Sequence, residues 1–157
     1  PAAAEAAAPH DHPPPRAARG TMKKKPTLPS APSIPTEQKS QLLAALLDEK
    51  QGEDIVVIDV TGTCPIAEHI IVVGARGQRH AQSLADAAMH LAKEKNFISF
   101  GMEGYDGGTW ILVDLNDIII HVFQDDVRRF YNIEGLWAEG KRVDAPTGLK
   151  RESDLED

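Results

Sequence analysis

The sequence predicts a mixed α/β domain in which a five-stranded sheet is flanked by helices. Short β-branched runs alternate with stretches whose apolar residues recur at helical spacing. A long amphipathic helix separates the second strand candidate from the later ones, which favours a parallel crossover. The last two strand candidates are joined only by a tight turn, which favours an antiparallel hairpin. Together these patterns indicate a mixed sheet with helices packed on it.

Length and composition limit the class of protein. A chain of 157 residues fits one domain with tails, and its single cysteine, Cys64, excludes an intramolecular disulfide and fits a reducing compartment. Apolar runs stay well short of the roughly 20 residues that a membrane span needs, so we expect no membrane association. The net charge of -7 argues against a phosphate-driven nucleic-acid binder. It would speed an encounter with a basic protein.

The chain divides into three segments. Residues 1–35 are rich in Ala and Pro and contain no aromatic residue, so we expect them to be disordered. Residues 36–140 form the expected domain, and residues 141–157 are a polar tail expected to fray. The first segment lacks the apolar core of a secretory signal and is a poor presequence, which favours a bacterial cytoplasm over an organelle.

The first half of the domain is predicted as helix, strand, strand and helix. Thr36 is the expected N-cap of a helix that carries four leucines at helical spacing and ends at Gly52. Two β-branched strands follow, at residues 55–60 and 70–73. An amphipathic helix then spans residues 78–95.

The second half is predicted as three strands and a helix. An edge strand is expected at residues 97–102, before a glycine-rich loop at residues 104–108. Strands at residues 110–115 and 118–124 form the hairpin. The last helix is predicted over residues 125–137, and its first turn holds two aspartates where the helix dipole favours them.

A tight turn at Asn116–Asp117 sorts the hairpin residues into two faces, because side chains alternate along a strand. One face is wholly aliphatic and must be core: it carries Ile111, Val113, Leu115, Ile118, Ile120 and Val122. The second face carries Trp110, Leu112, Asp114, Ile119, His121 and Phe123.

The second face has two readings. It is very apolar for a solvated surface, yet it includes a carboxylate and an imidazole. It could be a second buried layer in which Asp114 and His121 are satisfied by hydrogen bonds. It could instead be a partner-binding patch with an aromatic anchor. The last helix places Arg128 and Arg129 among bulky apolar residues, a mixture typical of interfaces.

Catalytic and metal-binding patterns are weak. The glycine-rich turn at residues 74–77 precedes a helix but lacks both dinucleotide and Walker patterns. Asp114 and Asp117 are arranged somewhat like the magnesium-binding pair of nucleotidyltransferases, although Asp117 lies in a turn. The histidines lack zinc-ligand spacing, and Cys64 has no histidine nearby in sequence. We therefore expect no enzymatic activity, cofactor or resident metal.

Three stretches resemble the Iojap family, the ribosomal silencing factors. They read DIVVIDVTG from Asp54, AEHIIVVGARGQRHAQSLAD from Ala67, and MEGYDGGTWILVDLNDIIIHVFQDDVRRFYNIEGLW from Met102. The resemblance covers nearly the whole expected domain, and the third stretch is the most specific. Its family-like positions are Glu103, Gly104, Trp110, Asp114, His121, Val122, Phe123, Arg128, Tyr131, Leu136 and Trp137.

The resemblance implies a nucleotidyltransferase-like topology without that activity. It implies a translational repressor that binds the large ribosomal subunit through its basic ribosomal protein number fourteen and sterically blocks subunit joining. Organellar relatives are linked to maturation of the large subunit. The partner-binding residues that it implies are Trp110, Leu112, Asp114, His121, Arg128 and Tyr131.

This resemblance favours the binding reading of the second hairpin face. It predicts that Trp110, Asp114 and His121 lie on one open surface beside the last helix, and that Trp110→Ala weakens binding without unfolding the domain. Two alternatives stay open. One is a nucleotide-binding or nucleotidyltransferase-like module that uses Asp114, Asp117 and the turn at residues 74–77. The other is a homodimer that pairs through the hairpin face.

Overall fold

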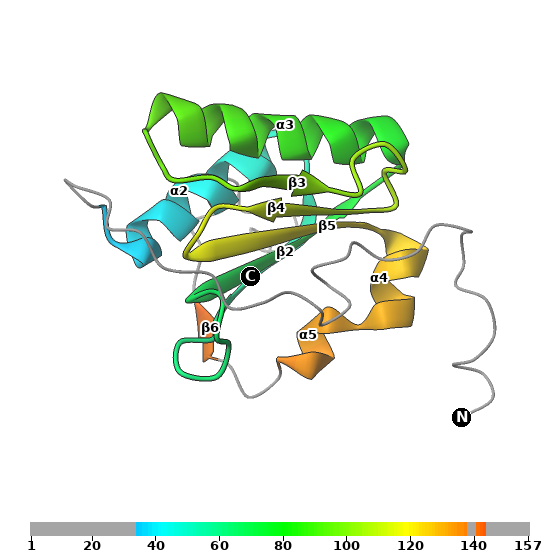
Figure 1. Ribbon diagram of the computed structural model, residues 1–157. Helices are drawn as coiled ribbons and strands as arrows, with labels where there is room; N and C mark the ends of the chain where they lie inside the picture. The colour runs from blue at the N-terminus through cyan, green and yellow to red at the C-terminus, as the bar shows by residue number, and fades with distance from the viewer. Residues whose placement is uncertain (1–33, 138–140, 144–157) are drawn as a thin grey trace, which may run out of the picture.

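A computed structural model describes residues 34–137 and 141–143 (Figure 1). The helices are α2 (Thr36–Glu49), α3 (Gln78–Glu94), α4 (Asp125–Tyr131) and α5 (Ile133–Leu136). The strands are β1 (Glu53–Asp59), β2 (His69–Ala75), β3 (Gly101–Glu103), β4 (Trp110–Asp114), β5 (Ile118–Gln124) and β6 (Lys141–Val143). Figure 1 shows α2 and α3 over one face of the sheet and α4 and α5 on the other side.

The strands form one mixed sheet in the order β3-β4-β5-β2-β1-β6. Among the described strands, β2 and β5 are the one parallel pair, joined by a connection that includes α3, and the other neighbours are antiparallel. The mixed α/β class is confirmed, and all five expected strands are present. A sixth strand, β6, lies beyond the boundary predicted at residue 140 and pairs with β1. The segment at residues 1–33 and most of the polar tail lie outside the described residues.

The hairpin register is confirmed. Trp110 pairs with Phe123, Leu112 with His121, and Asp114 with Ile119. The turn is closed by the Leu115 amide, which donates to the Ile118 carbonyl over 2.9 Å. Asn116 adopts a φ of 74° there, a left-handed conformation that Asn tolerates better than most residues.

The sheet separates two hydrophobic cores. The aliphatic hairpin face packs against α2 and α3, as expected, in a core that includes Leu43, Leu47 and Leu84. The second hairpin face belongs to another core on the opposite side, together with Ile58, Ile70 and Val72 of the neighbouring strands. The sheet is thus buried on both faces, which explains why β2 and β5 read as nearly continuous apolar runs.

Several predicted element boundaries differ from the structure, and three of these differences change the description of the fold. The expected edge strand at residues 97–102 is reduced to β3. The expected last helix at residues 125–137 is interrupted at Asn132. This residue has a left-handed φ of 48° and is both the C-cap of α4 and the N-cap of α5. Pro35, rather than Thr36, occupies the N-cap of α2, and no side chain caps that end.

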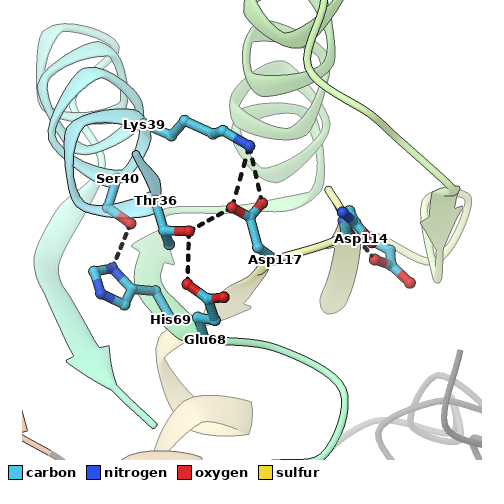
Figure 2. A network of polar contacts seen from close by, with 8 residues as sticks. Thr36, Lys39, Ser40, Glu68, His69, Asp114 and Asp117 are labelled. Atoms are coloured by element: carbon cyan, nitrogen blue, oxygen red, sulfur yellow. Dashed lines mark hydrogen bonds and ion pairs between the residues drawn. The ribbon is translucent and has the colours of Figure 1, made fainter. Parts of the chain in front are cut away.

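The Thr36 side chain instead joins a polar network that fastens α2 to the sheet (Figure 2). Its hydroxyl oxygen lies 2.5 Å from Asp117 Oδ2 and 2.8 Å from Glu68 Oε1. One turn later, the buried Lys39 ammonium donates to both oxygens of Asp117 over 3.1 and 3.2 Å. Neighbouring Ser40 Oγ lies 2.7 Å from His69 Nδ1. The network ties the first turn of α2 to the start of β2 and to the hairpin turn.

We expect Lys39→Met to destabilise the domain by about 3 kcal/mol, because the Asp117 carboxylate would stay largely buried without its cation. Urea unfolding followed by far-UV circular dichroism measures this. Lys50→Met, at an exposed lysine just beyond α2, removes the same charge and should change stability by less than about 0.5 kcal/mol. Equal effects of the two substitutions would contradict the structural role of the pair.

Candidate partner-binding site

An aromatic cluster joins the second hairpin face to α4. The Trp110 ring lies 4.6 Å from Phe123 and 4.8 Å from Tyr131, measured between ring centroids. Its indole Nε1–H donates to His121 Nδ1 over 3.0 Å. The rings are tilted to one another, and both separations fall within the range of about 4.5–7 Å between centroids that is typical of interacting aromatic pairs. The structure therefore brings Trp110, His121 and Tyr131 of the predicted site into one cluster.

The hydrogen bond from Trp110 sets the state of the His121 ring. Because an indole N–H can only donate, Nδ1 of His121 must accept, and the neutral ring carries its proton on Nε2. Burial lowers the pKa of His121 from 6.5 to about 4. The imidazole is therefore uncharged near neutral pH and keeps its bond to Trp110.

The expectation that these residues form an open surface is wrong. Trp110 is 4% exposed, His121 5% and Asp114 7%, and Leu112 is also buried. The other reading of the second face, a second buried layer, is the correct one for the chain by itself. The sequence pattern could not decide this, because β-strand periodicity shows which residues share a face but not what covers that face.

Asp114 and Leu112 lie on β4 beside this cluster. The Asp114 carboxylate accepts a hydrogen bond from the Asn116 amide over 3.0 Å, which helps to shape the hairpin turn. In Figure 2 its carboxylate points away from Asp117. The nucleotidyltransferase interpretation requires the two aspartates to share one site, and in this structure they do not.

Arg128 is engaged within the domain. Its Nε and Nη2 donate to both carboxylate oxygens of Glu134, over 2.9 and 3.0 Å. Its Nη1 donates to the Glu53 carbonyl over 3.2 Å, and Nη2 to the Asp54 carbonyl over 2.7 Å. The guanidinium thus joins α4 to α5 and joins both helices to the start of β1.

The accessible part of this region lies on α4 and α5. Leu136 is 69% exposed and Phe130 39%, while Tyr131 and Trp137 are half-buried. The Phe130 and Tyr131 rings meet edge to face, with 4.9 Å between their centroids. We call these four residues the α4–α5 surface. The sequence did not indicate Leu136 as a contact, because its exposure is visible only in the structure.

The residues proposed for a nucleotide site are spread along the sheet. Asp117 precedes β5 and the turn at residues 74–77 begins at the end of β2. The two strands pair in parallel along the whole of β2, from His69 to Ala75. Six residues at about 3.3 Å each place the two features about 20 Å apart. In that turn the Arg76 amide already donates to His80 Nδ1 over 3.0 Å. The described residues contain no group of three or more His, Cys, Asp or Glu side chains that could hold a metal.

None of the described helices is both long and apolar enough to cross a bilayer.

Because Trp110 is core, we expect Trp110→Ala to lower the free energy of unfolding by about 3–5 kcal/mol. This replaces the expectation that the substitution affects binding alone. Urea unfolding of the variant measures the loss. Phe100→Ala, at a ring that is 48% exposed, is a control that should cost far less. A variant as stable as the parent would show that Trp110 does not support the fold.

The lowered pKa of His121 predicts a loss of stability in acid. Between pH 6.5 and about 4 the unfolded chain binds a proton at this residue and the folded chain does not, so stability falls as pH falls through that window. The difference between these two pKa values corresponds to a loss of stability on the order of 3 kcal/mol. Urea unfolding at pH 7, 5.5 and 4.5 should show it. His121→Gln keeps an acceptor for Trp110 without titrating, and its stability should depend less on pH; an unchanged dependence would contradict this account.

Comparison with known proteins supports the predicted family. The family model described as "Ribosomal silencing factor during starvation" matches residues 33–157. A Bacillus subtilis protein, "Ribosomal silencing factor RsfS", is 34% identical over 116 residues, which cover 73% of this chain and 98% of the relative. A mouse protein, "Mitochondrial assembly of ribosomal large subunit protein 1", is 25% identical over 99 residues, which cover 61% of this chain and 43% of the relative.

The fold is also shared with solved structures. The crystal structure of a Chromobacterium violaceum protein matches with a TM-score of 0.65 and 27% identity, over 78% of this chain and 99% of that one. The likeness to nucleotidyltransferases stays a prediction. The family model covers more than half of the chain, and the Bacillus subtilis relative is matched over almost its whole length. This chain therefore belongs to the ribosomal silencing factor family.

Proposed function

We propose that this protein represses translation by binding the large ribosomal subunit through ribosomal protein number fourteen and thereby sterically blocking the small subunit. Membership of the ribosomal silencing factor family carries this proposal. The name of the mouse relative supports the choice of the large subunit. A bacterial cytoplasm is the proposed setting, since the bacterial relatives are matched over nearly their whole length.

The surface chemistry supports binding to a protein partner. The chain carries a net charge of -7, which suits an encounter with a basic ribosomal protein. The α4–α5 surface combines exposed Leu136 and Phe130 with two half-buried aromatic rings. Aromatic residues are enriched where protein interfaces exclude water, so this surface is the proposed point of contact.

The six residues of the predicted site are then proposed to have two roles. Tyr131 contributes to the contact directly, because it lies at the edge of the aromatic cluster and is half-buried. Trp110, Leu112, Asp114 and His121 form the buried layer that supports it. Arg128 joins α4 to α5 and to β1.

The proposed mechanism is occlusion, which needs no bond making and no cofactor. A bound domain blocks subunit joining if it occupies surface that the small subunit must approach. Neither alternative gains a supporting observation. The residues proposed for a nucleotide site lie about 20 Å apart along the strands. The buried hairpin face offers no ready surface for a homodimer.

Sedimentation through a sucrose gradient tests the proposal. Purified large and small subunits would be mixed with and without the full-length chain. The proposal predicts that the protein migrates with the large subunit and reduces the fraction of joined ribosomes. Free protein at the top of the gradient, with joining unchanged, would contradict it.

The contact surface is tested by Leu136→Ser. We expect it to weaken binding to large subunits about fivefold or more, on the order of 1 kcal/mol, because an exposed apolar contact is lost. Its stability should change little, since the side chain is 69% exposed. Phe100→Ser is a matched control: Phe100 is also exposed, but its amide pairs with the Asp114 carbonyl, at the end of β4 away from α4. Equal losses in both variants would contradict this placement of the surface.

A further inference from the structure

The Arg128 guanidinium uses four of its five N–H donors inside the domain. Two donate to the Glu134 carboxylate as a bidentate pair, and the other two to the adjacent carbonyls of Glu53 and Asp54. The Arg128 side chain is 11% exposed. Such a fork-shaped arrangement depends on the planar guanidinium and cannot be reproduced by a lysine.

The start of β1 is shaped to receive this side chain. The pairing of β1 with β2 shifts between Glu53 and Val56, which marks a β-bulge. Asp54 in this bulge has a φ of 48°, a conformation that non-glycine residues seldom adopt. Successive carbonyls of a regular strand point to opposite sides, so two neighbours can reach one guanidinium only because the strand is irregular here.

Space for the guanidinium comes from Gly74 on β2. A Cβ placed on this residue would lie 3.3 Å from Arg128 Nη1 and 3.3 Å from the Glu53 carbonyl oxygen. The absence of a side chain at this position therefore leaves room for the contact. Residues from β1, β2, α4 and α5 thus converge on one arginine.

We propose that Arg128 is a positioning residue of the partner-binding site and not a contact residue. Its guanidinium holds α4 and α5 at a set angle to each other and to β1, and so keeps the α4–α5 surface in the arrangement that the partner recognises. The break at Asn132 makes such a tie necessary, because the two short helices do not share one continuous hydrogen-bonded backbone. The inference rests on the proposed function, since it concerns the shape of that same site.

Neighbouring Arg129 provides a matched control. It is also on α4, but its side chain is 74% exposed, and its ion pair among the described residues is with the similarly exposed Asp125. Arg129→Gln removes the same charge as Arg128→Gln without disturbing the tie between the helices. Any general effect of losing one positive charge therefore appears in both variants, whereas a loss of positioning appears only in Arg128→Gln.

The experiment is a titration of large ribosomal subunits with full-length variants, at a temperature where circular dichroism shows every variant folded. We expect Arg128→Gln to weaken binding about tenfold and Arg128→Lys to rescue little of that loss. Glu134→Gln should weaken binding about threefold, since the two carbonyl contacts remain. The double variant should bind no worse than Arg128→Gln, and Arg129→Gln should bind like the parent.

Several results would overturn the positioning role. If Glu134→Gln bound like the parent, or if the losses multiplied in the double variant, Arg128 would act on the partner independently of Glu134. If Arg128→Lys restored binding, the positive charge of Arg128, and not the bidentate geometry of its guanidinium, would be what binding requires. A merely structural role would lower the unfolding midpoint and leave the affinity of the folded protein unchanged.

Hydrogen exchange on the free protein separates this inference from the proposed function. Arg128→Gln should speed exchange at residues 53–56 and 133–137, and Arg129→Gln should not. Unchanged exchange in Arg128→Gln would show that no such tie exists. A parent chain that fails to bind large subunits would instead remove the proposed function, and the positioning role with it, whatever the exchange shows.

Discussion

The parallel pairing of β2 with β5 is the constraint on which the other features depend. It places the hairpin in the centre of the sheet and makes its second face continuous with Ile70 and Val72. It also brings the hairpin turn beside His69, where Asp117 can reach Lys39 and Thr36 of α2. The same direction of the strands places α4 at the opposite end of the sheet. One end of the sheet is therefore bonded to α2 through Asp117, and the aromatic cluster lies at the other end.

That cluster connects the fold to the proposed function. Trp110 bonds to His121 within the hairpin and packs on Tyr131 of α4, so the position of α4 follows from the hairpin register. Arg128 then relates α4 to α5 and to β1. The α4–α5 surface is therefore held in place by apolar packing against the sheet and by the bidentate ion pair between Arg128 and Glu134. A protein that acts by occlusion needs such rigidity, because flexible contacts lose binding energy when they are ordered.

Much of this fold could be predicted from residue patterns that span only a few positions of the sequence. The hairpin register and the core-facing aliphatic set follow from strand alternation and a two-residue turn. The unpredicted features depend on contacts between residues distant in sequence. Lys39 meets Asp117 across 78 positions, and Arg128 meets the Asp54 carbonyl across 74. The burial of Trp110 likewise depends on α4 and α5, which follow β5 and pack on this face of the sheet. The residue pattern of the hairpin itself does not show what covers that face. The break at Asn132 was missed because helical spacing continues through it.

The chain is proposed to meet the large subunit through the α4–α5 surface. Hydrogen–deuterium exchange of the full-length protein, free and bound to purified large subunits, tests this contact. We expect slower exchange on binding at residues 125–137, with little change in α2 and α3 on the other side of the sheet (Figure 1). Protection confined to α2 and α3, or no protection in either place, would contradict it.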